Sequence, residues 1–250
     1  MSRIRYYTDF AQDMVTSPET RELPSDYQWL PQTTAQRVGD RLIATVCRWV
    51  GRAVIAPVWH YHVVGLAKLR QAPQGIFLYA NHTQPVGDAF MPLVLGGRRQ
   101  TYVIAAPSNL SVPVMGKLVP RGGGLVLPST RRQLVQFNQV VASVIAAGAM
   151  VTVYPEAHVW PYATQIRPFV PGAFHYPVAT QAPVFVQTNV YTRRHGRPRI
   201  TAYIDGPIVP DQHLSQPAQR RQLAAAVAVQ MKQRAALSDA SYIEYRRKEE

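Results

Sequence analysis

Two short, nearly uninterrupted apolar runs constrain the fold of this chain most strongly. Ile76–Ala80 reads Ile-Phe-Leu-Tyr-Ala, and Met150–Tyr154 reads Met-Val-Thr-Val-Tyr. Neither run alternates polar and apolar residues, so each is predicted as a strand that is buried on both faces. Strands of this kind are typical of a parallel sheet that is covered by helices on both sides.

The rest of the chain supports an α/β architecture, a largely parallel or mixed central sheet flanked by helices. Residues 1–32 show no clear period and are predicted to be extended. Further strands are predicted at 101–105, 184–191 and 200–204, and helices at 33–57, 87–95, 130–147 and 215–247. We expect one globular domain with an N-terminal extension and amphipathic helix (1–58), a catalytic core (59–210) and a C-terminal helix (211–250).

The segment from Leu42 to His60 is the most apolar helical stretch, but Arg48 and Arg52 interrupt it on one face. No run of about 18 uncharged apolar residues occurs, so a membrane-spanning helix is not predicted. The segment fits an amphipathic helix that lies in a membrane interface. An ordinary surface helix packed on the core is an equal alternative.

The net charge of +13 favours a polyanionic partner. The basic residues are spread along the chain without a nucleic-acid-binding motif, which favours an anionic membrane surface over nucleic acid. The N-terminus lacks the apolar region of a signal peptide, and the single cysteine, Cys47, fits a reducing compartment. We therefore expect a peripheral protein on the cytoplasmic face of the membrane.

Acidic residues are almost absent from the middle of the chain. Between Asp40 and Asp205 there are sixteen Lys and Arg residues but only two acids, Asp88 and Glu156. Both acids follow predicted buried strands, and ligands of open α/β sheets bind beyond the carboxyl ends of the strands. Functional roles are therefore predicted for both, although helix capping or pairing with arginines would also explain them.

His82 lies in the run Asn81-His82-Thr83-Gln84-Pro85-Val86-Gly87-Asp88. An imidazole becomes an effective general base when a carboxylate holds one ring nitrogen and leaves the other for the substrate. Six residues on one continuous helix would place His82 and Asp88 on different faces. Pro85 and Gly87 break the helix, so we expect His82 on a loop and Asp88 in the first helical turn.

No nucleophile accompanies this base. The chain lacks a Gly-x-Ser-x-Gly elbow and a nucleotide-binding glycine loop. His60, His62 and His158 lack a convincing set of partner ligands, so no metal is predicted. A base without a nucleophile suggests direct transfer of a group to a substrate hydroxyl.

The order of these motifs resembles the glycerolipid acyltransferases, the 1-acylglycerol-3-phosphate acyltransferase group, over roughly residues 60–208. The resemblance implies that His82 is the base and that Asp88 orients it, with Asn81 among the substrate-binding residues. Five residues separate His82 from Asp88, one more than in the family's Asn-His-x4-Asp block.

Two further blocks are similar to those of the family. Gly116–Arg121 resembles the second block, which implies that Arg121, with Lys117 as a further candidate, contacts the acceptor's phosphate. Tyr154–Val159 resembles the third block, Phe-Pro-Glu-Gly-Thr-Arg; it keeps Glu156, which the resemblance assigns to substrate binding, but has Val159 at the arginine position. Arg167 is expected to compensate.

The resemblance implies acyl transfer from coenzyme A or acyl carrier protein to a hydroxyl of a phosphorylated glycerolipid such as lysophosphatidate, in phospholipid biosynthesis. The acyl thioester is a co-substrate, and no cofactor is expected. Backbone N–H groups near Gly122–Gly124 are expected to stabilise the oxyanion. The alternatives are another lipid acceptor, a non-catalytic lipid-binding protein on the same fold, and a nucleic-acid-binding protein that relies on charge alone.

Overall fold

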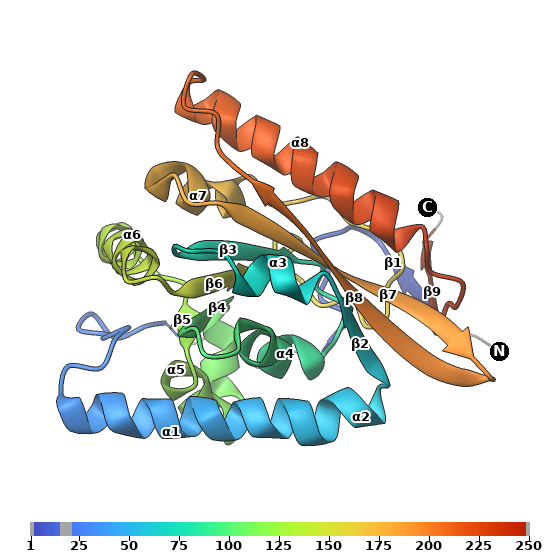
Figure 1. Ribbon diagram of the computed structural model, residues 1–250, viewed down its shortest axis with the longest axis horizontal. Coiled ribbons are helices and arrows are strands. Elements are labelled where there is room, and N and C mark those ends of the chain that lie inside the picture. Colours follow the sequence, from blue (N-terminus) through green and yellow to red (C-terminus); the bar gives the residue numbers. More distant parts are fainter. Residues whose placement is uncertain (1–2, 16–21, 249–250) are drawn as a thin grey trace.

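A computed structural model describes residues 3–15 and 22–248, which form a seven-stranded sheet and a separate two-stranded sheet (Figure 1). The large sheet has the strand order β2 (Tyr61–Val64), β8 (Arg197–Ile208), β7 (Val184–Arg194), β3 (Ile76–Ala80), β6 (Met150–Val153), β4 (Thr101–Ala105) and β5 (Gly124–Val126). The five strands from β7 to β5 are parallel, whereas β8 is antiparallel to β7 and parallel to β2. The predicted α/β fold with a largely parallel, mixed sheet is confirmed.

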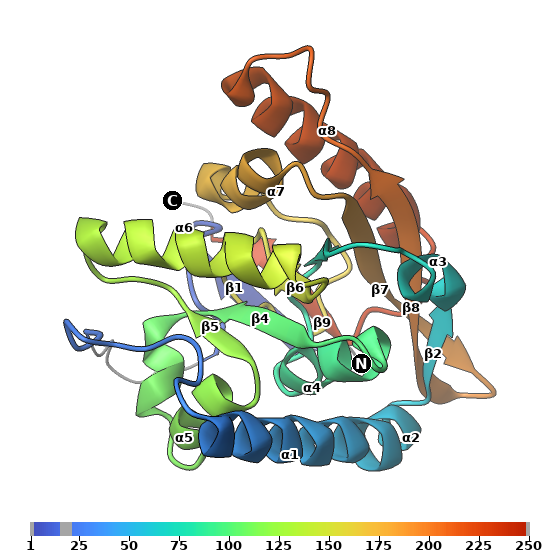
Figure 2. The same cartoon turned by 60° about the vertical axis from the view of Figure 1, so that its left-hand side comes forward.

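Helices cover both faces of the sheet. The helical segments are α1 (Thr34–Val50), η1 (Gly51–Ile55), α2 (Ala56–Val58), α3 (Leu66–Arg70), α4 (Gly87–Gly96), η2 (Pro107–Ser111), α5 (Met115–Arg121), α6 (Arg131–Ala146), η3 (Pro171–Phe174), α7 (His175–Thr180) and α8 (Gln216–Ala235). Helices α6, α7 and α8 lie on one face, and α3 and α4 lie on the other, with α1 packed outside α4 (Figures 1 and 2). The two faces of the protein are therefore built from different helices.

Each face of the sheet has its own apolar core. On the face of α6, α7 and α8, Phe77 and Tyr79 of β3 pack in one cluster with Phe137 of α6. On the opposite face, Leu78 of β3 packs with Leu95 of α4. Alternate residues of β3 thus point into opposite cores, which explains why this strand has no polar residue.

The long N-terminal helix begins with a capping box in which the Thr33 side chain accepts from the Gln36 backbone N–H and the Gln36 side chain accepts from that of Thr33. From Gly51 the helical path continues through the π-helical turn η1 and ends in α2, at Val58. The helix predicted at 33–57 is confirmed. Pro57 lies in the last turn, where the helix has almost ended.

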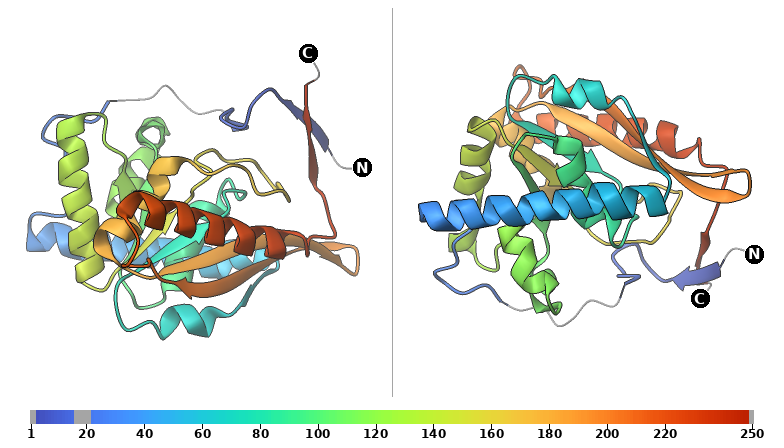
Figure 3. Two further views of the ribbon diagram at one scale, coloured as in Figure 1. Left: turned by 90° about the horizontal axis from the view of Figure 1, so that it is seen from above. Right: turned by 60° about the horizontal axis from the view of Figure 1, so that its bottom comes forward.

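The predicted helix at 215–247 is wrong in its last third. Helix α8 ends at Ala235, and Ile243–Arg247 forms the strand β9, which pairs in parallel with β1 (Arg3–Tyr7). The two strands lie side by side at one end of the molecule (Figure 3). Tyr242, Ile243 and Tyr245 favour a strand, but their partner is more than 230 residues away in the sequence, so no local pattern revealed it.

Candidate functional site

The candidate site lies where the central strand β3 ends and the chain turns into α4. Here Nδ1 of His82 lies 2.8 Å from Oδ2 of Asp88, within hydrogen-bond distance. The same carboxylate oxygen accepts from the backbone N–H of Gln84 at 2.9 Å, and the N–H of Asp88 donates to the Gln84 carbonyl oxygen. The loop therefore turns tightly enough to bring His82 and Asp88 together despite the extra residue between them.

Gly87 is closely packed in this turn. A Cβ atom added to Gly87 would lie 3.1 Å from the Cβ atom of Gln84, which is closer than most such contacts. Gly87 also begins α4, so Asp88 lies in the first turn of that helix, as the sequence predicted. His82 lies in the loop before α4 and Asp88 in the first turn of that helix, which lets the two side chains meet.

Within the described residues, the pair leaves the Nε2 atom of His82 without a hydrogen-bond partner. Asp88 is 5% exposed, whereas the His82 side chain is 17% exposed and reaches solvent. Burial raises the pKa of the Asp88 carboxyl, and the hydrogen bond with His82 opposes that rise. Because a carboxylate only accepts hydrogen bonds, Nδ1 of His82 donates to Asp88, and Nε2 is the ring nitrogen that remains for a substrate.

Tyr154 is a site residue whose role the sequence reasoning missed. Its ring stacks on the imidazole of His82, with ring centroids 4.2 Å apart, and its hydroxyl donates to the backbone oxygen of Asp88 at 2.7 Å. Burial raises the pKa of the Tyr154 phenol well above its ordinary value, so this hydroxyl stays protonated and can donate. The only signal in the sequence was a tyrosine where the family has a phenylalanine.

Glu156 and Arg167 form a buried ion pair, with Nη2 of Arg167 2.8 Å from Oε2 of Glu156 and both side chains almost fully buried. Oε2 of Glu156 also accepts from the backbone N–H of His82 at 2.9 Å, and Oε1 accepts from the backbone N–H of Arg167. Nη2 of Arg167 donates to the carbonyl oxygens of His82 and His158. The pair thus holds the backbone of His82 at both its N–H and its carbonyl group.

Strand order explains why Glu156 meets His82. β6 is the neighbour of β3, and their register places Val153 beside Tyr79, so the loops that follow the two strands begin side by side. Sequence analysis placed both residues at the same edge of the sheet, and the structure confirms that placement. The guanidinium of Arg167 also lies 4.9 Å from the centre of the Trp160 ring, a cation–π contact.

Asn81 connects two strands at the base of the site. Its side-chain oxygen accepts from the backbone N–H of Asn189 in β7 at 2.8 Å, and its amide donates to the Asn189 carbonyl oxygen at 3.2 Å. Asn81 is 1% exposed. A substrate contact for Asn81, as for Glu156 and Arg167, stays a prediction.

The second-block residues lie apart from His82. Helix α5 leads from η2, after the carboxyl end of β4, back to the start of β5, so Lys117 lies in its first turn and Arg121 at its far end. Nε of Arg121 is 3.3 Å from Oδ1 of Asp40 in α1. The phosphate contacts assigned to both residues stay predictions, and Lys117 is the nearer to the carboxyl-end edge.

The expected oxyanion donors at Gly122–Gly124 are wrongly placed. These glycines lead into the start of β5, three strands away from β3 in the sheet, whereas His82 follows the end of β3. The backbone N–H of Gly122 already donates to the Leu118 carbonyl oxygen at 2.7 Å. A glycine-rich sequence alone did not reveal at which edge of the sheet it would lie.

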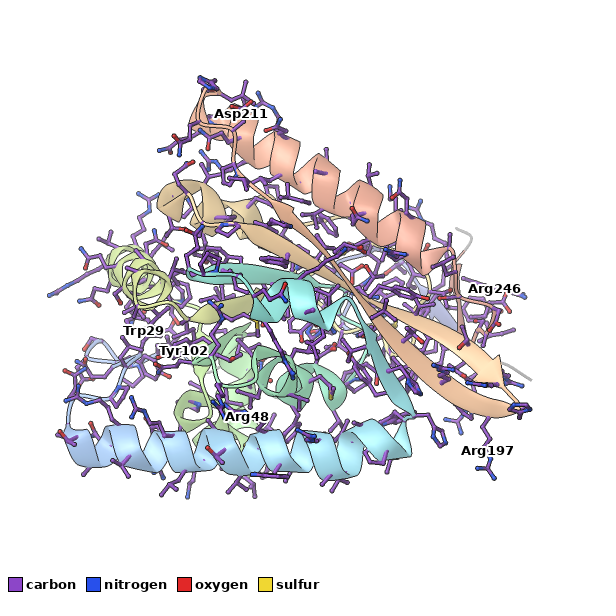
Figure 4. The ribbon with its side chains drawn as sticks, viewed as in Figure 1. Trp29, Arg48, Tyr102, Arg197, Asp211 and Arg246 are labelled. Carbon is purple, nitrogen blue, oxygen red and sulfur yellow. The ribbon has the colours of Figure 1, made fainter. Side chains whose placement is uncertain are left out.

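An apolar stripe runs along the outer face of α1 and its continuation to α2. Its side chains, each more than half exposed, are Val38, Leu42, Val46, Trp49, Val54 and Val58. Their spacing of three to five residues places them on one side of the helix. On the inner side, Arg48 donates to the Leu93 carbonyl oxygen of α4 at 3.1 Å (Figure 4). Within residues 3–15 and 22–248, no helix is both long and apolar enough to cross a bilayer.

Comparisons with known proteins agree with the fold and the motifs. The family model described as Acyltransferase matches residues 60–192, which include His82, Asp88 and Glu156. The fold is similar to that of the 1-acyl-sn-glycerophosphate (LPA) acyltransferase PlsC from Thermotoga maritima, with a TM-score of 0.57, 14% identity, and coverage of 81% of this chain and 84% of that chain. No curated protein matches this chain in sequence.

Proposed function

Because this chain belongs to the acyltransferase family, we propose that it transfers a fatty acyl group from an acyl thioester to a hydroxyl of a phosphorylated glycerolipid such as lysophosphatidate. The observation that carries this proposal is the 2.8 Å contact between His82 and Asp88 at the carboxyl end of β3. It provides a general base with a free ring nitrogen at the edge where open α/β sheets bind ligands.

In the proposed reaction, Nε2 of His82 removes the proton of the acceptor hydroxyl as its oxygen attacks the thioester carbonyl carbon. The tetrahedral intermediate then collapses, the carbon–sulfur bond breaks, and the leaving thiolate takes the proton from Nε2 of His82, which restores the base. Asp88 keeps the imidazole in the required tautomer and stabilises its positive charge while the proton is held there. General-base catalysis of this kind contributes roughly 10²–10⁴-fold to the rate.

Tyr154 and the Glu156–Arg167 pair are proposed as positioning residues for His82. Tyr154 covers one face of the imidazole and binds the backbone of Asp88, and the ion pair binds the backbone of His82. A displacement of about 1 Å can reduce a rate by roughly 10²-fold, so this support matters for a base that sits on a loop.

The acceptor's phosphate is proposed to contact Lys117 and Arg121. The buried residues Asn81, Glu156 and Arg167 are proposed to shape the substrate site. A glycerolipid acceptor other than lysophosphatidate is the second candidate. It is favoured by Val159 at the arginine position of the third block, since Arg167 turns its Nη2 atom toward Glu156 and backbone oxygens.

Helix α1 is proposed to dock the enzyme on the cytoplasmic face of an anionic membrane. Its exposed apolar stripe would enter the interface, and the net charge of +13 would attract anionic lipids. Each side chain of the stripe stays more than half exposed in the described protein, whereas the ordinary surface helix considered from sequence would bury its apolar side chains. The acceptor lipid would then be reached from the membrane.

The test is an acyl-transfer assay with purified protein, lysophosphatidate and other lysolipids, and acyl donors on coenzyme A and on acyl carrier protein. We expect thiol release together with a diacyl product, and a loss of at least about 10²-fold in His82→Gln. His213→Gln, an exposed histidine in a loop, serves as the matched control.

Full transfer activity in His82→Gln would refute His82 as the base. Thiol release without a diacyl product would indicate a thioesterase. Binding of lysolipid with no thiol release from any donor would favour the non-catalytic lipid-binding protein.

A further inference from the structure

Strand β7 extends beyond the end of β3 and runs beside the loop that carries His82. The two strands are neighbours in the sheet, with Gln187 of β7 beside Ala80 of β3 (Figure 1). β3 ends at Ala80, whereas β7 continues to Arg194. Tyr191 lies four residues after Gln187 and on the same face of the strand, so β7 brings its side chain to the loop that follows β3.

The Tyr191 hydroxyl binds two consecutive residues of this loop. It donates to Oγ1 of Thr83 at 2.7 Å and accepts from Nε2 of Gln84 at 2.6 Å. Burial raises the pKa of the Tyr191 phenol above its ordinary value, so the hydroxyl stays protonated and can donate. Tyr191 and Thr83 are 0% exposed and Gln84 is 3% exposed. Both hydrogen bonds are therefore shielded from water, and the loss of one partner would leave a buried polar group unpaired.

Gln84 connects the Tyr191 hydroxyl to Asp88. The backbone N–H of Gln84 donates to Oδ2 of Asp88 at 2.9 Å, and the Gln84 carbonyl oxygen accepts from the Asp88 N–H at 3.0 Å. The same Oδ2 atom lies 2.8 Å from Nδ1 of His82. A displacement of Gln84 would therefore move the carboxylate relative to the imidazole.

Tyr191 is itself held on several sides, whereas the tip of the loop is exposed at Pro85 and Val86. The backbone N–H and carbonyl groups of Tyr191 form hydrogen bonds with the segment between α8 and β9. The rings of Tyr162 and Tyr242 pack edge-on against its ring, with centroids 5.9 and 6.0 Å away. The hydroxyl of Tyr191 thus has a fixed place from which it can hold the start of the loop.

We propose that Tyr191 is a positioning residue for the His82–Asp88 pair. Its hydroxyl holds Thr83 and Gln84, so that the carboxylate of Asp88 stays within hydrogen-bond distance of the imidazole although five residues separate the two. Because Tyr191 is fully buried, it acts through the loop and touches no substrate. This proposal rests on the proposed role of His82 as the general base.

Tyr191→Phe tests the proposal because it removes the hydroxyl and keeps the ring. The kcat of acyl transfer should fall by about tenfold or more with little change in the KM for the lipid, since the base is displaced while the substrate sites are kept. Gln84→Met breaks the same connection from the side of the loop and should also lower kcat. In the double variant the loss should be smaller than the product of the two single losses, because both changes remove one connection.

The contact between His82 and Asp88 can be measured without turnover, by NMR of protein with isotopically labelled histidine. The proton on Nδ1 of His82, which is held against a carboxylate, should resonate far downfield, and His82→Gln assigns the signal. In Tyr191→Phe this resonance should move upfield or disappear. The matched control is Tyr79→Phe, which removes another fully buried hydroxyl, one that donates to the Ala173 carbonyl oxygen in the core beneath α6 and α7. It should keep both the wild-type kcat and the resonance.

In folded Tyr191→Phe protein, an unchanged kcat or an unchanged His82 resonance would overturn the proposal. A raised KM with unchanged kcat would overturn it as well, because Tyr191 would then shape the substrate site. If Tyr191→Phe does not fold, Gln84→Met decides by the same two measurements. If the wild-type protein transfers no acyl group, the proposed function fails, and the resonance alone decides whether Tyr191 positions the pair.

Discussion

Breaking the ion pair between Glu156 and Arg167 should destabilise the protein more than removing both charges together. Glu156→Gln leaves the Arg167 guanidinium buried without a counter-charge, beside backbone oxygens and the Trp160 ring. Loss of one partner of such a pair costs about 3–5 kcal/mol. Since a typical domain has only about 5–15 kcal/mol of stability, this is a large fraction of the total.

The double variant Glu156→Gln/Arg167→Met removes both charges and keeps much of the volume. Its loss of unfolding free energy should be smaller, by at least about 2 kcal/mol, than the summed losses of the single variants Glu156→Gln and Arg167→Met. Urea unfolding of the four proteins of the cycle gives this coupling energy directly. Glu244→Gln is the matched control, because its ion pair with Arg246 is about half exposed and should contribute less than about 1 kcal/mol.

The same variants test the support of His82. Where Glu156→Gln is still folded, kcat should fall by about 10²-fold with little change in KM, since the base is displaced while the substrate sites are kept. If the double variant loses as much unfolding free energy as the two single variants together, within about 0.5 kcal/mol, the reasoning about the pair is refuted. A wild-type kcat in folded Glu156→Gln would refute the role in positioning His82.

Three further predictions follow from other parts of the structure. Asp88→Asn should reduce kcat on the order of 10²-fold or more, because the tautomer of the base is no longer fixed; unchanged turnover at saturating lipid would contradict this. Trp49→Ser should weaken binding to anionic vesicles about tenfold, and added salt should weaken it further, whereas the exposed Val229→Ser on α8 should have no effect in a sedimentation assay. The hydrogen bonds from Arg234 lower the pKa of Asp205 below its usual value. The ionised carboxylate therefore stabilises the folded protein at pH values above the usual pKa, and this stabilisation is lost as the pH falls through the lowered pKa. Asp205→Asn should therefore cost about 1–2 kcal/mol near neutral pH, and the difference in unfolding free energy should disappear in acid.

Local patterns were sufficient wherever burial on both faces determined the element. The apolar run Ile76–Ala80 identified the central strand. The scarcity of acids singled out Asp88 and Glu156 before any geometry was known, and both contact His82 in the structure. They meet His82 because the parallel strands before them end at a common edge.

Long-range partners could not be read from the sequence. The strand Ile243–Arg247 depends on a partner at the other end of the chain, and the Glu156–Arg167 pair depends on a loop that returns to the end of β6. Arg167 was expected to replace the family's arginine, but no local pattern indicated that its Nη2 atom would bind the backbone of His82. The edge of the sheet at which Gly122–Gly124 lie was likewise set by the strand topology, which local sequence does not show.

The pairing of β1 with β9 also sets the order in which the protein can mature during synthesis. Trp160, whose backbone N–H binds the His82 carbonyl oxygen at 3.1 Å, is covered by Tyr7 from β1 and by Tyr245 from β9, each with its ring centre 4.8 Å away. Residues 3–7 emerge early from the ribosome, whereas 243–247 emerge more than 230 residues later. The sheet can collapse while translation continues, but the loop behind the base reaches its final packing only when the last strand arrives. In a nascent chain, the loop behind His82 would thus reach its final packing only when synthesis of these residues is almost finished.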